Sequence, residues 1–299
     1  MINVANAPCS WGVLEFEGGT PPADYAQVLD EIRDTDYAGT ELGDWGFMPT
    51  APARLRAEVK ARGLELVGAF VPVAFANAAA HDAGAATAIR TAALMRDAGF
   101  PNAFIVLSDD NASVGTRERN AGRIGPEHGL PDDGWMTFAA GVDQVANAVR
   151  VETGLRTVFH PHCGGYVETT DEIDRLMELT DHKRVGLVLD TGHIVYGGGD
   201  PLSVLQTHRH RVWHVHFKDC DMQVAETARD RGLGYLEAVR AQLFCELGKG
   251  VVDFHGVADA LRNSKYEGWI VVEQDVFPGY GSPKESASRS REFLRGMGL

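Results

Sequence analysis

Hydrophobic and polar positions along the chain alternate between two kinds of segment. Short apolar runs rich in β-branched and aromatic residues predict strands, and segments with apolar positions at helical spacing predict helices. The predicted strands are 2–8, 38–42, 64–70, 102–107, 155–160, 185–190, 212–217 and 269–274. The predicted helices are 23–34, 51–62, 84–98, 134–152, 170–180, 201–208, 230–246, 255–264 and 283–297. Strands and helices therefore follow one another along the whole chain.

This alternation is typical of βα units around a parallel sheet. Eight strands within 299 residues predict an α/β protein with a single (β/α)8 TIM barrel, one domain over 1–299. A doubly wound sheet is disfavoured because no Gly-x-Gly-x-x-Gly turn follows the first strand and the chain has no P-loop motif. Two connections, 108–133 and 219–254, are longer than a barrel needs, and we expect lids, binding loops or disordered segments there.

The charge balance narrows the class of partner. With 28 basic and 42 acidic residues, the formal net charge is -14, whereas nucleic-acid binders concentrate Lys and Arg to displace counterions. We therefore expect no nucleic-acid partner and a small neutral or polar molecule as substrate.

The cysteines and the N-terminal segment bear on the compartment. Four cysteines lie far apart without a Cys-x-x-Cys pair, which predicts reduced thiols rather than a zinc knuckle or a disulfide framework. The segment MINVANAPCSWG lacks the pattern of a signal peptide, and no run of about 18 apolar residues occurs. We expect a cytoplasmic protein without a membrane partner.

Potential metal ligands stand at the ends of four consecutive predicted strands, where a TIM barrel carries its active site. They are His160, Asp190, His216 and Glu273. Taken singly, each has a plainer interpretation: a hydrogen-bonded histidine, a helix cap or a solvated acid. Four together favour one site for a divalent metal ion, because imidazole and carboxylate suit Mn²⁺, Co²⁺, Fe²⁺ or Zn²⁺. We expect Mn²⁺ or Co²⁺, with Fe²⁺, Zn²⁺ or Mg²⁺ as alternatives, since these ligands do not themselves select the metal.

Further histidines lie beside these strand ends. In the segment FHPHCGG, His162 stands two residues after the end of the fifth strand, and the two glycines predict a turn. His193, in Asp-Thr-Gly-His, comes just past the sixth strand, near enough to contact a substrate. Both are candidates for proton transfer or substrate binding.

The seventh strand carries alternating polar residues. His214, His216 and Lys218 share one face by the period-two rule, and we expect that face to point into the barrel, with His214 contacting substrate. A lysine beside a divalent cation is expected to have a lowered pKa, which suits proton transfer. The alternative is that Lys218 pairs with Asp219 or another acid as structural support.

Aromatic residues and one acid follow the first three strands. Trp11, Phe70 and Trp45 predict an aromatic wall for a polyhydroxylated ring, whose C–H faces stack while its hydroxyls need polar partners. Glu41, at the end of the second strand, is a candidate for proton transfer. Ordinary barrel packing is the alternative for the aromatic residues.

Several separate motifs resemble a known group of barrels. The segments DTGH, HVHFKD, GKGVVDF and GWIVVEQD resemble the xylose-isomerase-like superfamily, often labelled sugar phosphate isomerases/epimerases. More narrowly, NAPCSWGV, FHPHCGGYVET and LGKGVVDF resemble the inosose dehydratase (2-keto-myo-inositol dehydratase) family. The resemblance covers nearly the whole chain and implies the barrel fold, with a homo-oligomer as an option because barrels of this superfamily commonly pair or form tetramers.

The resemblance also implies site residues. It carries the metal pattern to Asp190, His216 and Glu273, with His193 near the substrate. Many members of the superfamily have a glutamate at the end of the fifth strand, where this chain has His160. His162 or Glu168 could therefore complete the metal shell instead of His160.

The resulting expectation is a metal-dependent dehydratase that removes water from a cyclic keto-polyol, such as 2-keto-myo-inositol, through an enediolate. Lys218 or Glu41 would take one proton-transfer role, and His193 or His162 the other. The alternatives are a ketose 3-epimerase or an aldose–ketose isomerase on a free or phosphorylated sugar, or a lyase on a 3-keto sugar. Because epimerases of this superfamily typically place a glutamate on the fifth strand, His160 weakens the epimerase alternative.

Two other classes of protein are alternatives to these enzymes of keto sugars. A barrel nuclease needs three clustered metals and a basic DNA face, which the net charge opposes. A non-catalytic sugar-binding barrel would not need ligands on four strands.

Overall fold

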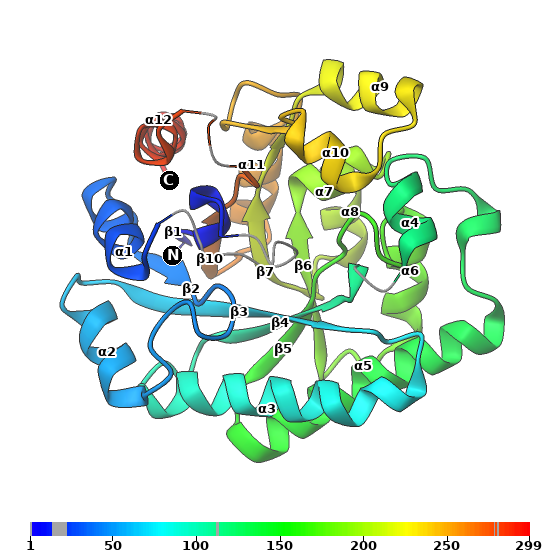
Figure 1. Ribbon diagram of the computed structural model, residues 1–299, viewed down its shortest axis with the longest axis horizontal. Coiled ribbons are helices and arrows are strands. Elements are labelled where there is room, and N and C mark those ends of the chain that lie inside the picture. The colour runs from blue at the N-terminus through cyan, green and yellow to red at the C-terminus, as the bar shows by residue number, and fades with distance from the viewer. Residues whose placement is uncertain (1, 14–22, 112–113, 278, 280) are drawn as a thin grey trace.

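Eight parallel strands close into a barrel (Figure 1) in the order β1-β10-β7-β6-β5-β4-β3-β2. The structure, a computed structural model, describes residues 2–13, 23–111, 114–277, 279 and 281–299. The barrel strands are β1 (Ile2–Asn6), β2 (Gly39–Glu41), β3 (Glu65–Val73), β4 (Phe104–Asp109), β5 (Arg156–Phe159), β6 (Val185–Asp190), β7 (Val212–Phe217) and β10 (Gly268–Val272). The predicted (β/α)8 barrel is confirmed.

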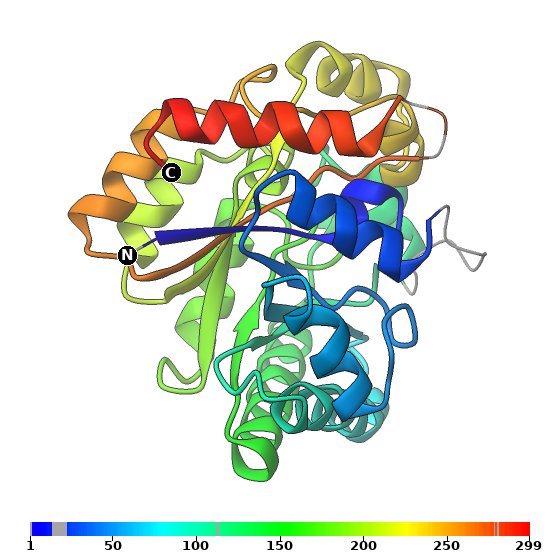
Figure 2. The same ribbon diagram turned by 90° about the vertical axis from the view of Figure 1, so that its left-hand side faces the viewer.

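Helices surround the barrel on its outer side (Figure 2). They are α1 (Tyr25–Asp34), α2 (Pro52–Lys60), α3 (His81–Asp97), α5 (Asp132–Thr153), α6 (Thr170–Leu179), α8 (Pro201–His208), α11 (Phe254–Asn263) and α12 (Pro283–Gly296). Local sequence sets their ends: Thr169 and Glu172 form a capping box at the start of α6, and Gly154, at φ 79°, ends α5. None of the helices among the described residues is long and apolar enough to cross a membrane.

The alternation of side chains along β4 shows that the barrel strands have one apolar core on each side. Phe104 and Val106 pack inside the barrel with residues of β5 and β6, whereas Ile105 and Leu107 belong to the core between the strands and the helices. The inner cluster fills the barrel below its carboxyl end. Polar groups at that end therefore rest on an apolar floor.

The two long connections contain short elements that lie over the same end of the barrel (Figure 1). The first holds α4 (Gly115–Asn120) and the 3-10 turn η4 (Pro126–His128); the second holds β8 (Asp219–Cys220), α9 (Met222–Arg231), α10 (Tyr235–Arg240) and β9 (Phe244–Cys245). The single helix predicted over 230–246 is wrong. Gly232, at φ 67°, ends α9, and α10 begins only after Gly234.

Three further short elements complete the described chain: η1 (Pro8–Trp11), η2 (Ala78–Ala80) and α7 (Thr191–Tyr196). The Asp219 carboxylate accepts backbone N–H groups from Gly248, Gly250 and Val252. This acid therefore fixes the return of the second connection toward α11.

A buried ion pair fixes the first connection to α6. Arg117, on α4, has a side chain only 1% exposed and donates to both oxygens of Glu172, at 2.7 and 2.8 Å. Its Nε donates to the Gly165 carbonyl at 2.7 Å. The guanidinium thus joins the connection to the turn that follows β5.

A second buried acid, Glu168, joins the same parts of the chain. Its oxygens accept the backbone N–H groups of Gly122 and Gly164, at 2.7 and 2.8 Å. Burial raises the pKa of Glu168 to about 7 from an ordinary value of 4.5, although both N–H groups and the charge of Arg117 lower it. The folded chain therefore favours the protonated carboxyl.

Replacing Arg117 should destabilise the fold strongly. Arg117→Met removes the cation that pairs with Glu172, whose side chain is 11% exposed and would keep only the backbone N–H groups of Glu168 and Thr169, and we expect the free energy of unfolding to fall by about 3 kcal/mol. The exposed pair of Arg33 with Asp30 provides the control: Arg33→Ala should cost less than about 1 kcal/mol. Urea unfolding followed by circular dichroism measures both, and equal small losses would show that the buried pair does not stabilise the connection.

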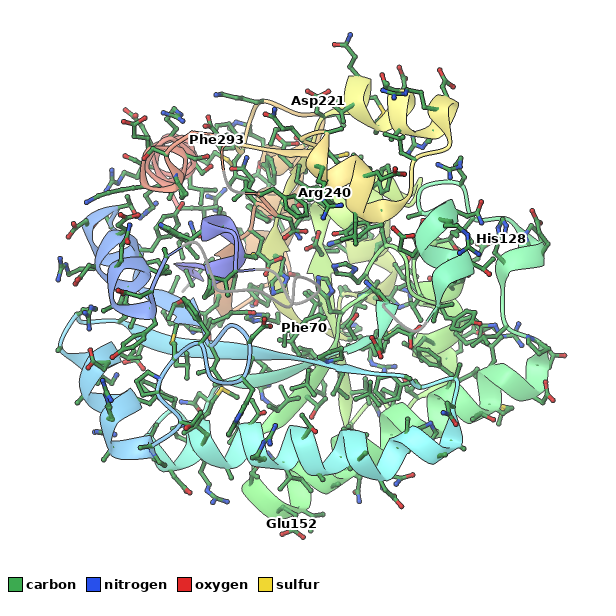
Figure 3. The ribbon with its side chains drawn as sticks, viewed as in Figure 1. Phe70, His128, Glu152, Asp221, Arg240 and Phe293 are labelled. Atoms are coloured by element: carbon green, nitrogen blue, oxygen red, sulfur yellow. The ribbon has the colours of Figure 1, made fainter. Side chains whose placement is uncertain are left out.

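The Glu168 carboxyl should make stability depend on pH. Since its folded pKa is raised, its contribution is fully present below about pH 4.5 and is lost as the pH rises through about 7. Relative to the wild type, Glu168→Gln should therefore gain up to about 3 kcal/mol in unfolding free energy between about pH 4.5 and 8. Glu152→Gln, at the edge of the molecule in Figure 3, should show no such trend. A constant difference between Glu168→Gln and wild type across this range would contradict the prediction.

Candidate active site

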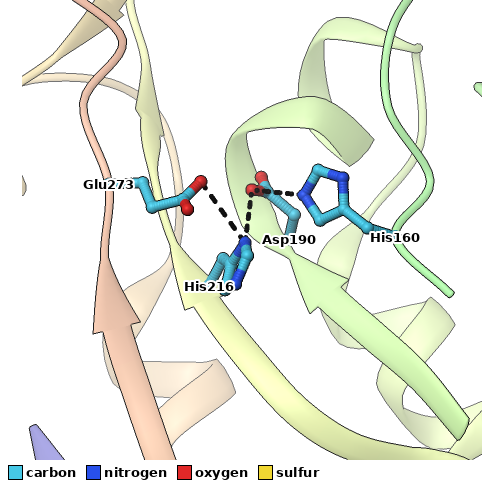
Figure 4. Close-up of side chains that lie close together, drawn as sticks. All are labelled: His160, Asp190, His216 and Glu273. Carbon is cyan, nitrogen blue, oxygen red and sulfur yellow. Dashed lines mark hydrogen bonds and ion pairs between the residues drawn. The ribbon is translucent and has the colours of Figure 1, made fainter. Parts of the chain in front are cut away.

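Four side chains from neighbouring strands meet at the carboxyl end of the barrel (Figure 4). They are His160 after β5, Asp190 at the end of β6, His216 on β7 and Glu273 after β10. All are buried, and one ligand atom from each lies within 4.8 Å of the others. We call this set the four-ligand cluster.

Each short distance inside the cluster involves Asp190 or His216. The Nε2 of His160 lies 3.3 Å from Asp190 Oδ2, and the Nδ1 of His216 lies 3.6 Å from the same oxygen. On its other side, His216 Nδ1 lies 3.3 Å from Glu273 Oε2. The register that pairs Asp190 with His216 brings these atoms together.

The donor set fits a divalent metal ion. The Nδ1 of His216 is buried and has no hydrogen-bond partner among the described residues, although it faces two carboxylates. Burial alone would lower the pKa of His216, but Glu273 and Glu41 raise it well above its usual value. A cation is thus favoured at this position, and two imidazoles with two carboxylates suit Mn²⁺, Co²⁺, Fe²⁺ or Zn²⁺.

The contribution of the fifth strand can be placed by geometry. His160 belongs to the four-ligand cluster, whereas His162 lies in a second group with His193 and Asp275. Glu168 points instead to the backbone of Gly122 and Gly164. Of the three sequence candidates, the structure brings His160 to the other ligands.

Glu41 and His214 form a buried pair below the cluster. His214 Nε2 lies 2.7 Å from Glu41 Oε1, and His216 Nε2 lies 3.1 Å from the same oxygen. Burial would raise the pKa of Glu41, but His216 and His214 lower it, so the acid is held as a carboxylate. Glu41 lines the cavity at the cluster, and His214 holds it from behind.

Lys218 lies among three carboxylates. Its Nζ is 3.0 Å from Asp275 Oδ2, 3.1 Å from Glu273 Oε2 and 3.9 Å from Asp190 Oδ2. Burial alone would lower the pKa of this lysine, but the carboxylates, Asp275 first, raise it well above its usual value. The lowered pKa predicted from a neighbouring cation is therefore opposed by the chain's own acids, and the partners of Lys218 are these acids rather than Asp219.

His162 and His193 lie beside Lys218, with ring centroids 4.0 Å apart and ring planes tilted by 40°. Burial lowers the pKa of both well below the usual value, so both are neutral imidazoles. His193 accepts the Cys163 N–H at Nδ1, 3.2 Å away, and its Nε2 lies 3.1 Å from Lys218 Nζ. His162 lines the cavity, while His193 stands behind Lys218.

The predicted aromatic residues lie in three different places. Phe70, near the middle of Figure 3, lines the same cavity as Glu41 and Lys218. Trp11 is buried in η1 and donates from Nε1 to Glu31 at 2.7 Å. Trp45 is 41% exposed beneath the guanidinium of Arg90, 4.1 Å from its ring. The described residues thus bring only Phe70 of the three to the cluster.

The described residues line a smaller and a larger cavity at this end of the barrel. The one at the cluster has a volume of about 50 Å³, enough for an ion and its water. A larger one, of about 600 Å³, lies between η1, α1, α12 and β9 and is lined by Trp11 and Gln274. Because Glu273 and Asp275 face the smaller cavity and Gln274 the larger, the reactive groups belong to the smaller one.

Two residues of this site were not predicted. Asp275 contacts Lys218 and accepts a hydrogen bond from the Tyr235 hydroxyl at 3.0 Å. The spacing of Asp275, two residues after Glu273, could have indicated it by alternation. Tyr235 begins α10, inside the segment predicted as one helix, and no local pattern marked it.

Comparisons with known proteins place the chain in a family. It matches the family described as "Xylose isomerase-like TIM barrel" over residues 23–297. It is 31% identical to an inosose dehydratase of Lacticaseibacillus casei over 294 residues, covering 98% of this chain and 96% of that protein. It is 33% identical to an inosose dehydratase of Geobacillus kaustophilus, covering 98% of this chain and 94% of that protein.

A solved structure shows the same fold. The IOLI protein with a binding zinc atom superposes with a TM-score of 0.72 at 13% identity, covering 99% of this chain and 97% of that chain. The chain belongs to the xylose isomerase-like TIM barrel family.

Proposed function

We propose that this protein is a divalent-metal-dependent dehydratase that removes water from a cyclic keto-polyol such as 2-keto-myo-inositol. The observation that carries the proposal is the four-ligand cluster, three of whose residues, His160, His216 and Glu273, line one cavity with Glu41 and Lys218. The similarity to inosose dehydratases over nearly the whole chain supports it. The proposed partner is a small polyhydroxylated keto substrate. We propose the cytoplasm as the place of the reaction.

A metal ion, with Mn²⁺ and Co²⁺ as first candidates, would be held by the four-ligand cluster. When bound, such an ion supplies Lewis-acid polarisation of a carbonyl oxygen and its neighbouring hydroxyl. With two imidazoles and two carboxylates, the cluster would leave a divalent ion formally neutral rather than negative, so that the ion could still polarise a substrate oxygen. Such polarisation would make a C–H bond beside the carbonyl acidic enough for a side-chain base.

Glu41 suits the role of base. It lines the cavity, and its contacts with His214 and His216 hold it as a carboxylate. It would accept the proton from the carbon beside the carbonyl, leaving the electron pair in an enediolate. Its position on β2, across the barrel mouth from Lys218 on the strand end of β7, separates the two proton-transfer groups.

Lys218 suits the role of acid. The surrounding carboxylates keep it as an ammonium, and it lines the same cavity as Glu41. As the C–O bond of the β-hydroxyl breaks, Lys218 would donate a proton, so that the group leaves as water. His193 holds the ammonium from behind, and the neutral His162 is placed to bind a substrate hydroxyl.

Removal of metal should abolish the reaction. After dialysis against EDTA we expect no conversion of 2-keto-myo-inositol, and added Mn²⁺ or Co²⁺ should restore it, as followed by the ultraviolet absorbance of the enol form of the 1,2-diketone product. Glu273→Gln should lower kcat/KM by at least about 100-fold, because even groups that only support a metal ligand are worth 10- to 100-fold. Glu285→Gln, on the exposed face of α12, should leave activity unchanged.

Two outcomes would contradict this proposal. One is full activity in metal-free protein. The other is epimerisation of a ketohexose by protein that does not dehydrate the inosose, which would favour the epimerase alternative.

Reactions in D₂O should distinguish the proposed base, Glu41, from the proposed acid, Lys218. Lys218→Met should still exchange the substrate hydrogen beside the carbonyl but should lose dehydration by about 10²- to 10⁴-fold, because only departure of water needs the acid. Glu41→Gln should lose exchange and dehydration together. Proton NMR of the substrate measures exchange, and the opposite pattern in the two variants would reverse the assignment.

A further inference from the structure

The position of Lys218 is unusual for a lysine side chain. Its ammonium is fully buried and lies within 3.1 Å of Asp275 Oδ2, Glu273 Oε2 and His193 Nε2, with Asp190 Oδ2 at 3.9 Å. The ring of Phe244 covers another side, 4.8 Å from Nζ to its centroid. Carboxylate and imidazole groups therefore surround this nitrogen in the way that they surround a metal ion.

Two of these oxygens also belong to the four-ligand cluster. Asp190 Oδ2 faces His160 and the ammonium, and Glu273 Oε2 lies 3.3 Å from His216 Nδ1 and 3.1 Å from Lys218 Nζ. Carboxylates shared between two cation positions are typical of two-metal sites, whose ions lie roughly 3.5–4 Å apart. The shared oxygens thus join a first cation position to a second one.

The second position has its own potential ligands. One nitrogen or oxygen each of His162, His193 and Asp275 lies within 4.8 Å of the others, and all three residues are buried. Two of them, His193 and Asp275, contact the ammonium directly. The Lys218 nitrogen therefore stands where a second metal ion would find these ligands.

We propose that the ammonium of Lys218 fills the second cation position of a latent two-metal site, so that the wild-type chain holds one divalent ion. The proposal rests on the metal site of the proposed function and assigns a further role to Lys218. Four buried carboxylates, those of Glu41, Asp190, Glu273 and Asp275, lie around the two positions. Without the ammonium, a single divalent ion leaves two of these negative charges uncompensated, which favours a second ion.

This arrangement has a chemical consequence. An ammonium can give a proton to a departing hydroxyl, whereas a metal ion at the same place would hold an oxygen ligand. Lys218 therefore selects proton donation at a position that the surrounding ligands would otherwise give to a metal.

The test is the number of metal ions per chain. Metal-free wild type, Lys218→Ala and Lys218→Met are each incubated with Mn²⁺, freed of unbound ion and analysed by mass spectrometry for metal and by electron paramagnetic resonance. We expect one Mn²⁺ in wild type, with the signal of an isolated ion. Both variants should hold two, with the signal of an exchange-coupled pair, and Lys218→Met decides the result if the alanine variant does not fold.

Two further variants control the interpretation. Adding Asp275→Asn to Lys218→Ala removes a ligand of the second position and should return the content to one ion. Lys249→Ala, whose side chain is 61% exposed and paired with Glu246, should behave as wild type. Circular dichroism melting curves establish that each variant is folded.

The outcomes separate this inference from the proposed function. Wild type that binds no ion contradicts the proposed metal site itself. Wild type with one ion, together with Lys218 variants that also bind one, overturns the second-cation role alone. Two ions in wild type overturn that role as well.

Discussion

The charge balance at the barrel mouth is the constraint on which this site depends. Four carboxylates are buried there on an apolar floor, where an unpaired charge is costly. Each has a cationic or hydrogen-bonding neighbour: His214 and His216 face Glu41, and Lys218 faces the three acids of β6 and β10. A divalent ion at the four-ligand cluster would complete the same balance.

Asp190 shows how one residue connects this balance to the fold. Its Oδ1 accepts the backbone N–H of His193 at 2.9 Å and caps α7, while its Oδ2 faces the cluster. The helix cap and the metal ligand, which the sequence offered as alternatives, would thus be two atoms of one carboxylate. Because α7 carries His193 to Lys218, the cap also orients the histidine behind the ammonium.

The two long connections bring residues that are distant in the sequence into contact with the charged groups at the barrel mouth. Through α10, the second connection delivers the Tyr235 hydroxyl to Asp275, which in turn holds Lys218. The first connection packs against α10 and is fixed by the buried Arg117. Segments outside the (β/α)8 repeat therefore support the polar groups that the repeat brings together.

Local pattern was enough to predict the strands and their polar ends. Period-two alternation and the position of a polar residue after an apolar run are properties of a few consecutive residues, so His216 and Lys218 could be assigned to one face of β7. Contacts across the barrel could not be predicted in this way: Glu41 and His214 are 173 residues apart in the chain. The same limit applies to Trp11, whose place in η1 depends on the packing of α1, and to Tyr235.

The histidine after β5 fits this balance in a way that a glutamate would not. Many members of the superfamily that this sequence resembles have a glutamate where this chain has His160. That glutamate would add a fifth carboxylate at the barrel mouth. The His160 imidazole instead brings its Nε2 to 3.3 Å from Asp190 Oδ2 and adds no further carboxylate. With four carboxylates rather than five, the three positive charges of a divalent ion and the Lys218 ammonium would leave one net negative charge at the barrel mouth. Lys218 could then remain a proton donor.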